Sequence, residues 1–133
     1  MLSDDPTLEE IEAVFANDRF ATVAAGCRVV SGGRGRAVCS MELADVHRNA
    51  MGNVMGGAIF TLADFALAIC CNIGEEPTVS VDSSISFFRS TQGAVLTATA
   101  VCDKPGRHLG FYTVTVEDDL GKQIAKMTAT CYR

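Results

Sequence analysis

One carboxylate lies inside the most apolar segment of this 133-residue chain. The run from residue 58 to residue 73 is apolar or small except for Thr61, Asp64 and Asn72. Burial raises the pKa of a carboxyl group in such surroundings unless hydrogen bonds offset the desolvation. Asp64 is therefore a candidate general base or nucleophile. The alternative is an aspartate that faces a partner helix or solvent.

Two glycines, Gly56 and Gly57, stand at the start of the same segment. A residue without a side chain allows a ligand to approach the backbone closely. At the start of a helix, free N–H groups and the positive end of the helix dipole favour a bound oxyanion. The alternative explanation of the pair is a tight turn into a packed helix.

A long helix is predicted to carry these groups. Its apolar residues run from about Gly56 to Cys71, and Gly74 and Pro77 then stop it. Such a helix is about 24 Å long. Because it is apolar nearly all round, one flat sheet face cannot cover it. Either a sheet wraps around it or a second subunit covers its far side.

The remaining elements are predominantly strands. Thr7 and Glu10 have the spacing of a capping box and predict a short amphipathic helix to about Asn17. Its predicted apolar face carries Leu8, Ile11, Val14 and Phe15. Alternating patterns predict strands at residues 21–31, 35–44, 78–88, 94–103, 109–118 and 122–132.

These elements together predict the fold class. Short turns between consecutive strands imply antiparallel neighbours. The fold is predicted to be α+β, with a long central helix wrapped by an antiparallel β-sheet. Residues 1–133 fit a single domain, and residues 1–19 form its N-terminal helical segment.

Composition narrows the class of protein. A net charge of −5 argues against a nucleic-acid-binding surface. The apolar run of the central helix is shorter than a membrane span needs, and the acidic N-terminus shows no signal peptide. The six cysteines and two histidines have no metal-ligand spacing and fit buried thiols in a reducing compartment. We expect a soluble, cytoplasmic protein without a metal, a membrane anchor or a nucleic-acid partner.

A known family has a similar pattern. The stretch HRNAMGNVMGG at residues 47–57, followed by Leu62, Ala63 and Asp64, resembles the PaaI-like group of hot-dog fold thioesterases. Further similarity falls at residues 79–82, 87–89, 93–98 and 121–125, so that the resemblance covers roughly residues 20–132.

The resemblance implies a hot-dog fold and hydrolysis of an acyl-CoA thioester. Asp64 would be the nucleophile or general base, and the Gly57 backbone N–H would polarise the thioester carbonyl. Asn49 and Ser80 would support them by hydrogen bonding, and Thr61, one turn before Asp64, would support it or line the acyl pocket. Coenzyme A is part of the substrate, so no separate cofactor is implied.

One position departs from the family pattern. Met55 stands where relatives have a histidine that orients the carbonyl or water, and a thioether cannot donate a hydrogen bond. The departure leaves open a non-catalytic acyl-CoA-binding or sensing module on the same fold. A third hypothesis is that the protein is a hot-dog dehydratase or hydratase that uses His47.

Further substrate contacts are expected at both ends of an acyl-CoA. Met55 and Gly56 adjoin the expected carbonyl site. For the phosphates of CoA, the candidate cations are expected to cluster around a strand end and the turn at residues 104–107; the alternative is an ordinary solvated turn. They are Arg89, Lys104, Arg107 and His108.

The spacing of Gly57 and Asp64 predicts a dimer. Seven residues along one helix span about 10 Å, whereas a carbonyl oxygen must lie within about 3 Å of its donor. Both groups of one helix therefore cannot act on one thioester. Two antiparallel helices about a two-fold axis would bring Gly57 of one subunit to Asp64 of the other. We expect an obligate homodimer or a dimer of dimers.

Overall fold

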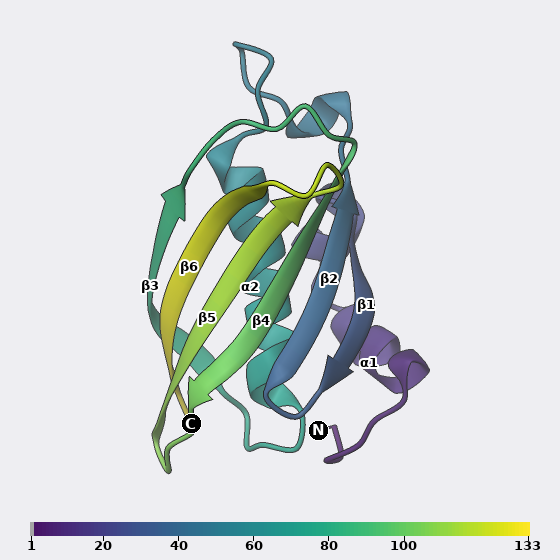
Figure 1. Cartoon of the computed structure of the whole chain (residues 1–133). Helices are drawn as coiled ribbons and strands as arrows, with labels where there is room; N and C mark the ends of the chain where they lie inside the picture. Colours follow the sequence, from purple (N-terminus) through teal and green to yellow (C-terminus); the bar gives the residue numbers. More distant parts are fainter. Residues whose placement is uncertain (1) are drawn as a thin grey trace.

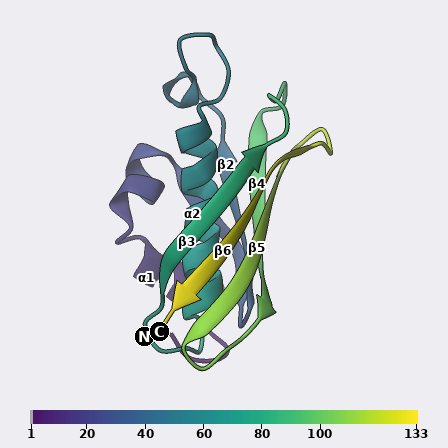
Figure 2. The same ribbon diagram turned by 90° about the vertical axis from the view of Figure 1, so that its left-hand side faces the viewer.

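A single long helix lies against one face of a six-stranded antiparallel sheet (Figures 1 and 2). The computed structural model describes residues 2–133. The order of strands in the sheet is β1-β2-β4-β5-β6-β3. The helices are α1 (Leu8–Phe15), a π-helical turn η1 (Phe20–Ala24), a 3₁₀ turn η2 (Asp45–His47) and α2 (Gly56–Asn72). The strands are β1 (Cys27–Gly33), β2 (Arg36–Glu42), β3 (Val79–Phe87), β4 (Val95–Lys104), β5 (Leu109–Asp118) and β6 (Gln123–Tyr132).

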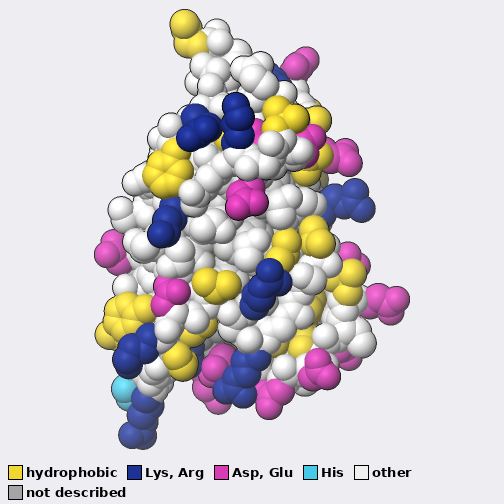
Figure 3. Space-filling model, viewed as in Figure 1, with side chains coloured by type: hydrophobic (Ala, Val, Ile, Leu, Met, Phe, Trp, Pro, Cys, Tyr) yellow, Lys and Arg dark blue, Asp and Glu magenta, His cyan; other side chains and the backbone are white. Residues whose placement is uncertain are grey.

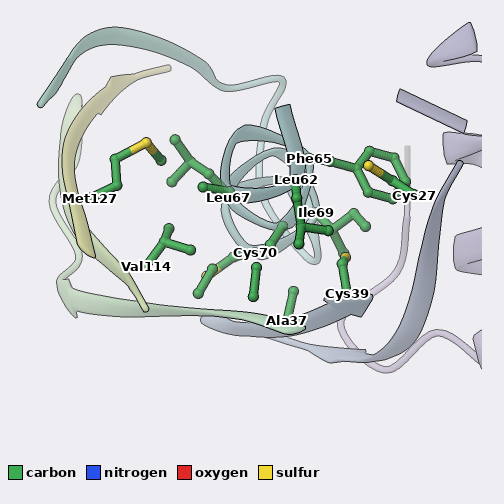
Figure 4. Packing of buried hydrophobic residues seen from close by; sticks show 14 of the residues in the cluster. Cys27, Ala37, Cys39, Leu62, Phe65, Leu67, Ile69, Cys70, Val114 and Met127 are labelled. Atoms are coloured by element: carbon green, nitrogen blue, oxygen red, sulfur yellow. The ribbon is translucent and has the colours of Figure 1, made fainter. Parts of the chain in front are cut away.

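The core lies between α2 and the inner face of the sheet. Alternate residues of β4, β5 and β6 point inward, as their period of two predicts. On the inner face of β2 and β4, the small residues Ala37, Cys39, Ala98 and Ala100 lie together, and the larger Met41 and Leu96 lie opposite each other beyond them. Figure 4 shows α2 side chains reaching opposite parts of the sheet, with Leu67 toward Met127 and Cys70 toward Ala37.

The N-terminal helix begins as its sequence predicts. Thr7 Oγ1 accepts the Glu10 N–H at 3.2 Å, and Glu10 Oε2 accepts the Thr7 N–H at 2.8 Å, which completes the capping box. Ile11 and Phe15 are buried, but Leu8 and Val14 are 42% and 43% exposed. The prediction of a four-residue apolar face was therefore half right, because only Ile11 and Phe15 of α1 pack against the rest of the domain.

The predicted strand at residues 21–31 was wrong in its first part. Phe20–Ala24 form a π-helical turn, and β1 begins only at Cys27, after Gly26 with a φ of 75°. The Thr22 hydroxyl donates to the Asp18 carbonyl at 3.0 Å and to the Ala16 carbonyl at 3.3 Å. Such local side-chain bonds stabilise a turn against the extended backbone that β-branched residues otherwise favour.

The position of β3 also differs from the sequence expectation. Consecutive strands were expected to be neighbours, but β3 pairs with β6 and forms an edge of the sheet. The link of seven residues from 88 to 94 crosses the ends of β6 and β5 to reach β4 (Figure 1). Three strand spacings are about 14 Å, and seven residues reach up to about 23 Å, so the link is long enough for the crossing.

All six cysteines are free thiols; five are buried, and Cys102 is partly exposed. Within residues 2–133, none of the helices combines the length and apolar character needed to cross a bilayer.

The core position of α2 gives a stability prediction. Leu62 is completely buried, whereas Leu120 is 59% exposed in the β5–β6 turn. We expect Leu62→Ala to lower the free energy of unfolding by about 2–5 kcal/mol and the matched control Leu120→Ala to lower it by less than about 0.5 kcal/mol. Urea denaturation measures both values. Equal losses would contradict the packing of α2 against the sheet.

Candidate active site

Asp64 lies on the face of α2 that the sheet leaves uncovered. The opposite face carries buried residues such as Leu62 and Ala66, but Gly57 is exposed and Asp64 is only half-buried. Asp64 opens into a cavity of about 340 Å³. The cavity is lined from α2 by Phe60, Thr61, Asp64, Phe65 and Ala68, and from the segment after α1 by Asp18, Arg19, Phe20 and Ala21.

The surroundings of Asp64 favour its protonated form. Burial raises the pKa of Asp64 above its usual value, and the nearby charge of Asp18 raises it further. Within residues 2–133, no hydrogen bond or ion pair to the Asp64 carboxylate counteracts this rise. A carboxylate with this increased basicity and with access to a cavity suits the role of a base that removes a proton from water.

The start of α2 presents free backbone donors. Met55 is the N-cap residue, and its carbonyl accepts the Ala58 and Ile59 N–H groups at 3.0 and 3.2 Å. The N–H groups of Gly56 and Gly57 have no acceptor among residues 2–133. A Cβ atom on Gly57 would meet nothing within 4 Å, whereas one on Gly56 would lie 3.1 Å from the Phe87 ring. The open approach to the helix start is therefore at Gly57.

Asn49 shapes the loop that leads into α2. Its Oδ1 accepts the Met51 and Asn53 N–H groups at 3.0 and 3.1 Å, and its own N–H donates to the Asn53 carbonyl at 2.7 Å. These contacts use the side-chain oxygen. Among residues 2–133 the Asn49 Nδ2 group has no acceptor, so it remains a donor for a bound molecule.

Thr61 and Ser80 occupy different surroundings. The Thr61 hydroxyl donates to the Gly57 carbonyl at 2.8 Å, and its side chain lines the cavity of Asp64. Ser80 is exposed near the start of the edge strand β3, opposite Cys131 of β6. Within one chain, Thr61 shares a cavity with Asp64, whereas Ser80 is not among the residues that line it.

His47 is a structural residue in this fold. It is 6% exposed, its Nδ1 accepts the Ala44 N–H at 3.0 Å, and its Nε2 lies 2.6 Å from the Ala25 carbonyl. A carbonyl can only accept, so Nε2 is the donor of this pair. Both ring nitrogens are occupied within the protein, which removes the main support for a dehydratase that uses His47.

The predicted cluster of cations is divided between the two ends of the sheet. Arg89 follows β3 and lines a cavity of about 330 Å³ next to Gly56 and Phe88. Lys104 ends β4, and Arg107 and His108 lie in the β4–β5 turn, at the opposite end (Figure 1). Figure 3 shows basic and histidine side chains gathered at that lower end. The expectation of one cluster was wrong within a chain, because β4 leads away from the end where Arg89 lies.

The sequence analysis missed the residues that form the other wall of the Asp64 cavity. Asp18, Arg19 and Phe20 precede β1 by several residues, and no motif marks them. Their contact with the α2 cavity depends on how the chain folds back after α1. A pattern read along the sequence gives no signal for it.

Comparisons with known proteins define the family. The sequence profile of the thioesterase superfamily matches residues 51–125. Acyl-coenzyme A thioesterase 13 of Homo sapiens is 32% identical over 122 residues, which cover 89% of this chain and 87% of that protein. Acyl-coenzyme A thioesterase PaaI of Escherichia coli is 30% identical over 126 residues, 94% of this chain and 89% of that protein. The chain belongs to the thioesterase superfamily.

Solved structures agree with this assignment. The Escherichia coli PaaI protein from the phenylacetic acid degradation operon has a TM-score of 0.87 at 26% identity, covering 95% of this chain and 92% of that chain. A Streptococcus mutans protein bound to acetyl CoA has a TM-score of 0.74 at 30% identity, covering 78% and 85%. The predicted PaaI-like hot-dog fold, a long helix wrapped by an antiparallel sheet, is confirmed.

The contacts of His47 give a testable consequence. We expect His47→Ala to leave the Ala44 N–H and the Ala25 carbonyl without partners and to lower the free energy of unfolding by about 1–3 kcal/mol. Met51→Ala, whose side chain is 84% exposed in the loop before α2, is the control and should change stability by less than about 0.5 kcal/mol. Chemical denaturation measures both variants. A fully stable His47→Ala protein would show that the two hydrogen bonds do not hold the loop.

Proposed function

We propose that the protein hydrolyses an acyl-CoA thioester to a free acid and CoA, with Asp64 as its reactive carboxylate. Membership of the thioesterase superfamily supports this reaction, as does similarity to two proteins named acyl-coenzyme A thioesterases. The observation that carries the proposal is the uncovered face of α2. It bears a half-buried carboxylate of raised pKa and, at the helix start, free N–H donors.

These groups match the needs of thioester hydrolysis. A carbonyl oxygen placed at the Gly57 N–H gains a hydrogen bond that strengthens as negative charge develops on it. Asp64, as general base, takes a proton from water while the hydroxide adds to the carbonyl carbon. The carbon–sulfur bond then breaks, and the CoA thiolate takes up the proton. As a nucleophile, Asp64 would instead form an anhydride, which water hydrolyses to the same products.

The same geometry supports a homodimer with shared sites. Gly57 and Asp64 are about 10 Å apart along one helix, so one thioester needs groups from two helices. The edge strand β3 has no partner on its outer side in the described chain, and its Val79 and Val81 are 63% and 59% exposed. Antiparallel pairing of two β3 edges would bring the uncovered faces of two α2 helices together.

An antiparallel dimer would also bring the two groups of cations together, because it sets the lower end of one subunit beside the upper end of the other. The β4–β5 turn with Lys104, Arg107 and His108 of one chain would then approach the end where Arg89 of the other lies. Phosphate groups of CoA would bind between these side chains, with Asn49, Ser80 and Thr61 nearer the reacting group.

Met55 supports a second candidate, a non-catalytic acyl-CoA-binding module. Its side chain is 48% exposed at the N-cap of α2 and can donate no hydrogen bond to a carbonyl or to water. Release of free thiol from a panel of acyl-CoAs separates the candidates. Binding without release at any pH would favour the binding module.

The catalytic assignment predicts the behaviour of Asp64→Asn. We expect this variant to lose thioester hydrolysis by about a hundredfold or more, because the amide cannot act as a base. Its stability at pH 7 should not fall. The raised pKa means that the folded state releases the Asp64 proton at higher pH than the unfolded state, so ionisation destabilises the fold as pH rises.

The measurements for Asp64→Asn are thiol release and thermal unfolding, with Glu117→Gln on the exposed face of β5 as the matched control. Wild-type turnover in Asp64→Asn would exclude Asp64 as base and as nucleophile. A variant that is inactive because it is unfolded would be recognised by its melting curve.

The shared site predicts complementation between two inactive chains. Gly57→Pro removes the proposed donor at a first-turn position where the helix does not use it, and Gly57→Ala keeps the donor as its control. Refolding equal amounts of Asp64→Asn and Gly57→Pro chains gives half of the dimers mixed, each with one intact site. We expect about a quarter of wild-type thiol release. A mixture as inactive as its parents, or an active monomer in sedimentation, would contradict the shared site.

A further inference from the structure

The Asp64 cavity contains a second carboxylate, Asp18. It comes from the short segment between α1 and β1, and it faces a cavity whose other wall is α2. The proposed hydrolysis does not require it. Within residues 2–133 its side chain makes no hydrogen bond or ion pair, although the neighbouring Arg19 lines the same cavity.

The backbone around Asp18 is held firmly. The Asp18 N–H donates to the Phe15 carbonyl at 3.0 Å. The Asp18 carbonyl accepts the N–H and the hydroxyl of Thr22 at 2.9 and 3.0 Å. Three hydrogen bonds therefore hold the backbone at Asp18, while its carboxylate has no salt-bridge partner among residues 2–133.

An aromatic contact joins this segment to the helix of Asp64. The rings of Phe15 and Phe65 meet edge to face, with centroids 6.2 Å apart and planes at 88°. Phe65 directly follows Asp64, and Phe15 lies three residues before Asp18. Packing of the two rings therefore holds the two segments that carry the carboxylates against each other, and both carboxylates line the same cavity.

Three charged or titratable groups of the described chain lie around Asp64. Asp18 and Arg19 face it from the segment before β1. The Cys131 thiol of β6 also lies within reach of its charge: the hydrogen bond with Cys71 lowers the pKa of Cys131, and Asp64 acts in the opposite direction. Burial raises the pKa of Asp18, and the Asp18 charge in turn adds to the burial that raises the pKa of Asp64.

We propose that Asp18 is a positioning residue of the hydrolytic site, which acts through Asp64 by placing a negative charge in the same cavity. This charge disfavours a second negative charge on Asp64 and so increases the affinity of Asp64 for a proton. A carboxylate that binds a proton more tightly is a stronger base toward water. The inference rests on the proposed function only for its catalytic consequence; the interaction of the two carboxylates stands on the cavity geometry.

The test is a titration of Asp64 in wild type and in Asp18→Asn. The ¹³C resonance of the Asp64 carboxyl group reports its ionisation directly, without any substrate. We expect Asp18→Asn to move the titration midpoint to lower pH by about half a unit, and the acidic limb of kcat/KM for thiol release to move by the same amount. About 1 M salt should reduce this shift, though less than it would for two exposed charges, because partly buried charges are screened less.

Two further variants complete the experiment. Asp18→Glu keeps the charge and should restore the wild-type midpoint, and Glu117→Gln removes an exposed charge on β5 and should leave it unchanged. An unshifted Asp64 midpoint in Asp18→Asn, or an equal shift in Glu117→Gln, would overturn the role of Asp18. Absence of thiol release from wild type would overturn the proposed function instead, while the resonance would still report on the two carboxylates.

Discussion

Helix α2 is apolar around most of its circumference, and one concave sheet face can cover only part of it. The small residues Ala37, Cys39, Ala98 and Ala100 let the helix sink into the sheet, and the strands curve around it (Figure 2). The side that remains is bordered by α1 and the segment after it. This uncovered side holds Gly57, Thr61 and Asp64, so the limit on coverage creates the site.

The site depends on a conflict between burial and charge. An ionised Asp64 in this position opposes folding, because burial and the Asp18 charge both favour its protonated form. The same two effects increase its basicity, which suits the base that we propose for hydrolysis. The extensive apolar contacts of α2 with β2, β4 and β5 compensate for the unfavourable charge and hold the carboxylate in place. Stability and chemistry are thus linked through one residue.

The entry to α2 is organised by polar contacts that themselves do no chemistry in the described chain. His47 joins the Ala25 and Ala44 backbones, its carbonyl accepts the Met55 N–H at 2.8 Å, and Asn49 folds the loop between them. These bonds bring the helix start to a defined position, with open space on the side-chain side of Gly57 and no acceptor for its N–H among residues 2–133. His47 thus has a structural role: its two ring nitrogens connect two backbone segments.

Much of this arrangement is present in the sequence. The period of two in β4, β5 and β6, the capping box at Thr7 and the apolar run with its two glycines each reflect local rules. They predicted these elements, including a helix with Gly57 in its first turn and Asp64 in its middle. The same local rules also gave a wrong prediction, the strand at residues 21–26. Thr22 has strand propensity, yet its hydroxyl stabilises a turn. The length of the seven-residue link after β3 is compatible with a hairpin to β4 as well as with the observed crossing past β6 and β5.

Only the tertiary structure decided which distant residues share a surface. The sequence placed Arg89 with Lys104, Arg107 and His108, but strand direction separates them by the length of the sheet. It gave no sign of Asp18, which reaches the Asp64 cavity because Phe15 packs on Phe65. Hydrophobic periodicity specifies which face of an element is buried. It does not specify which other element buries that face, because any apolar surface of suitable shape satisfies the same pattern.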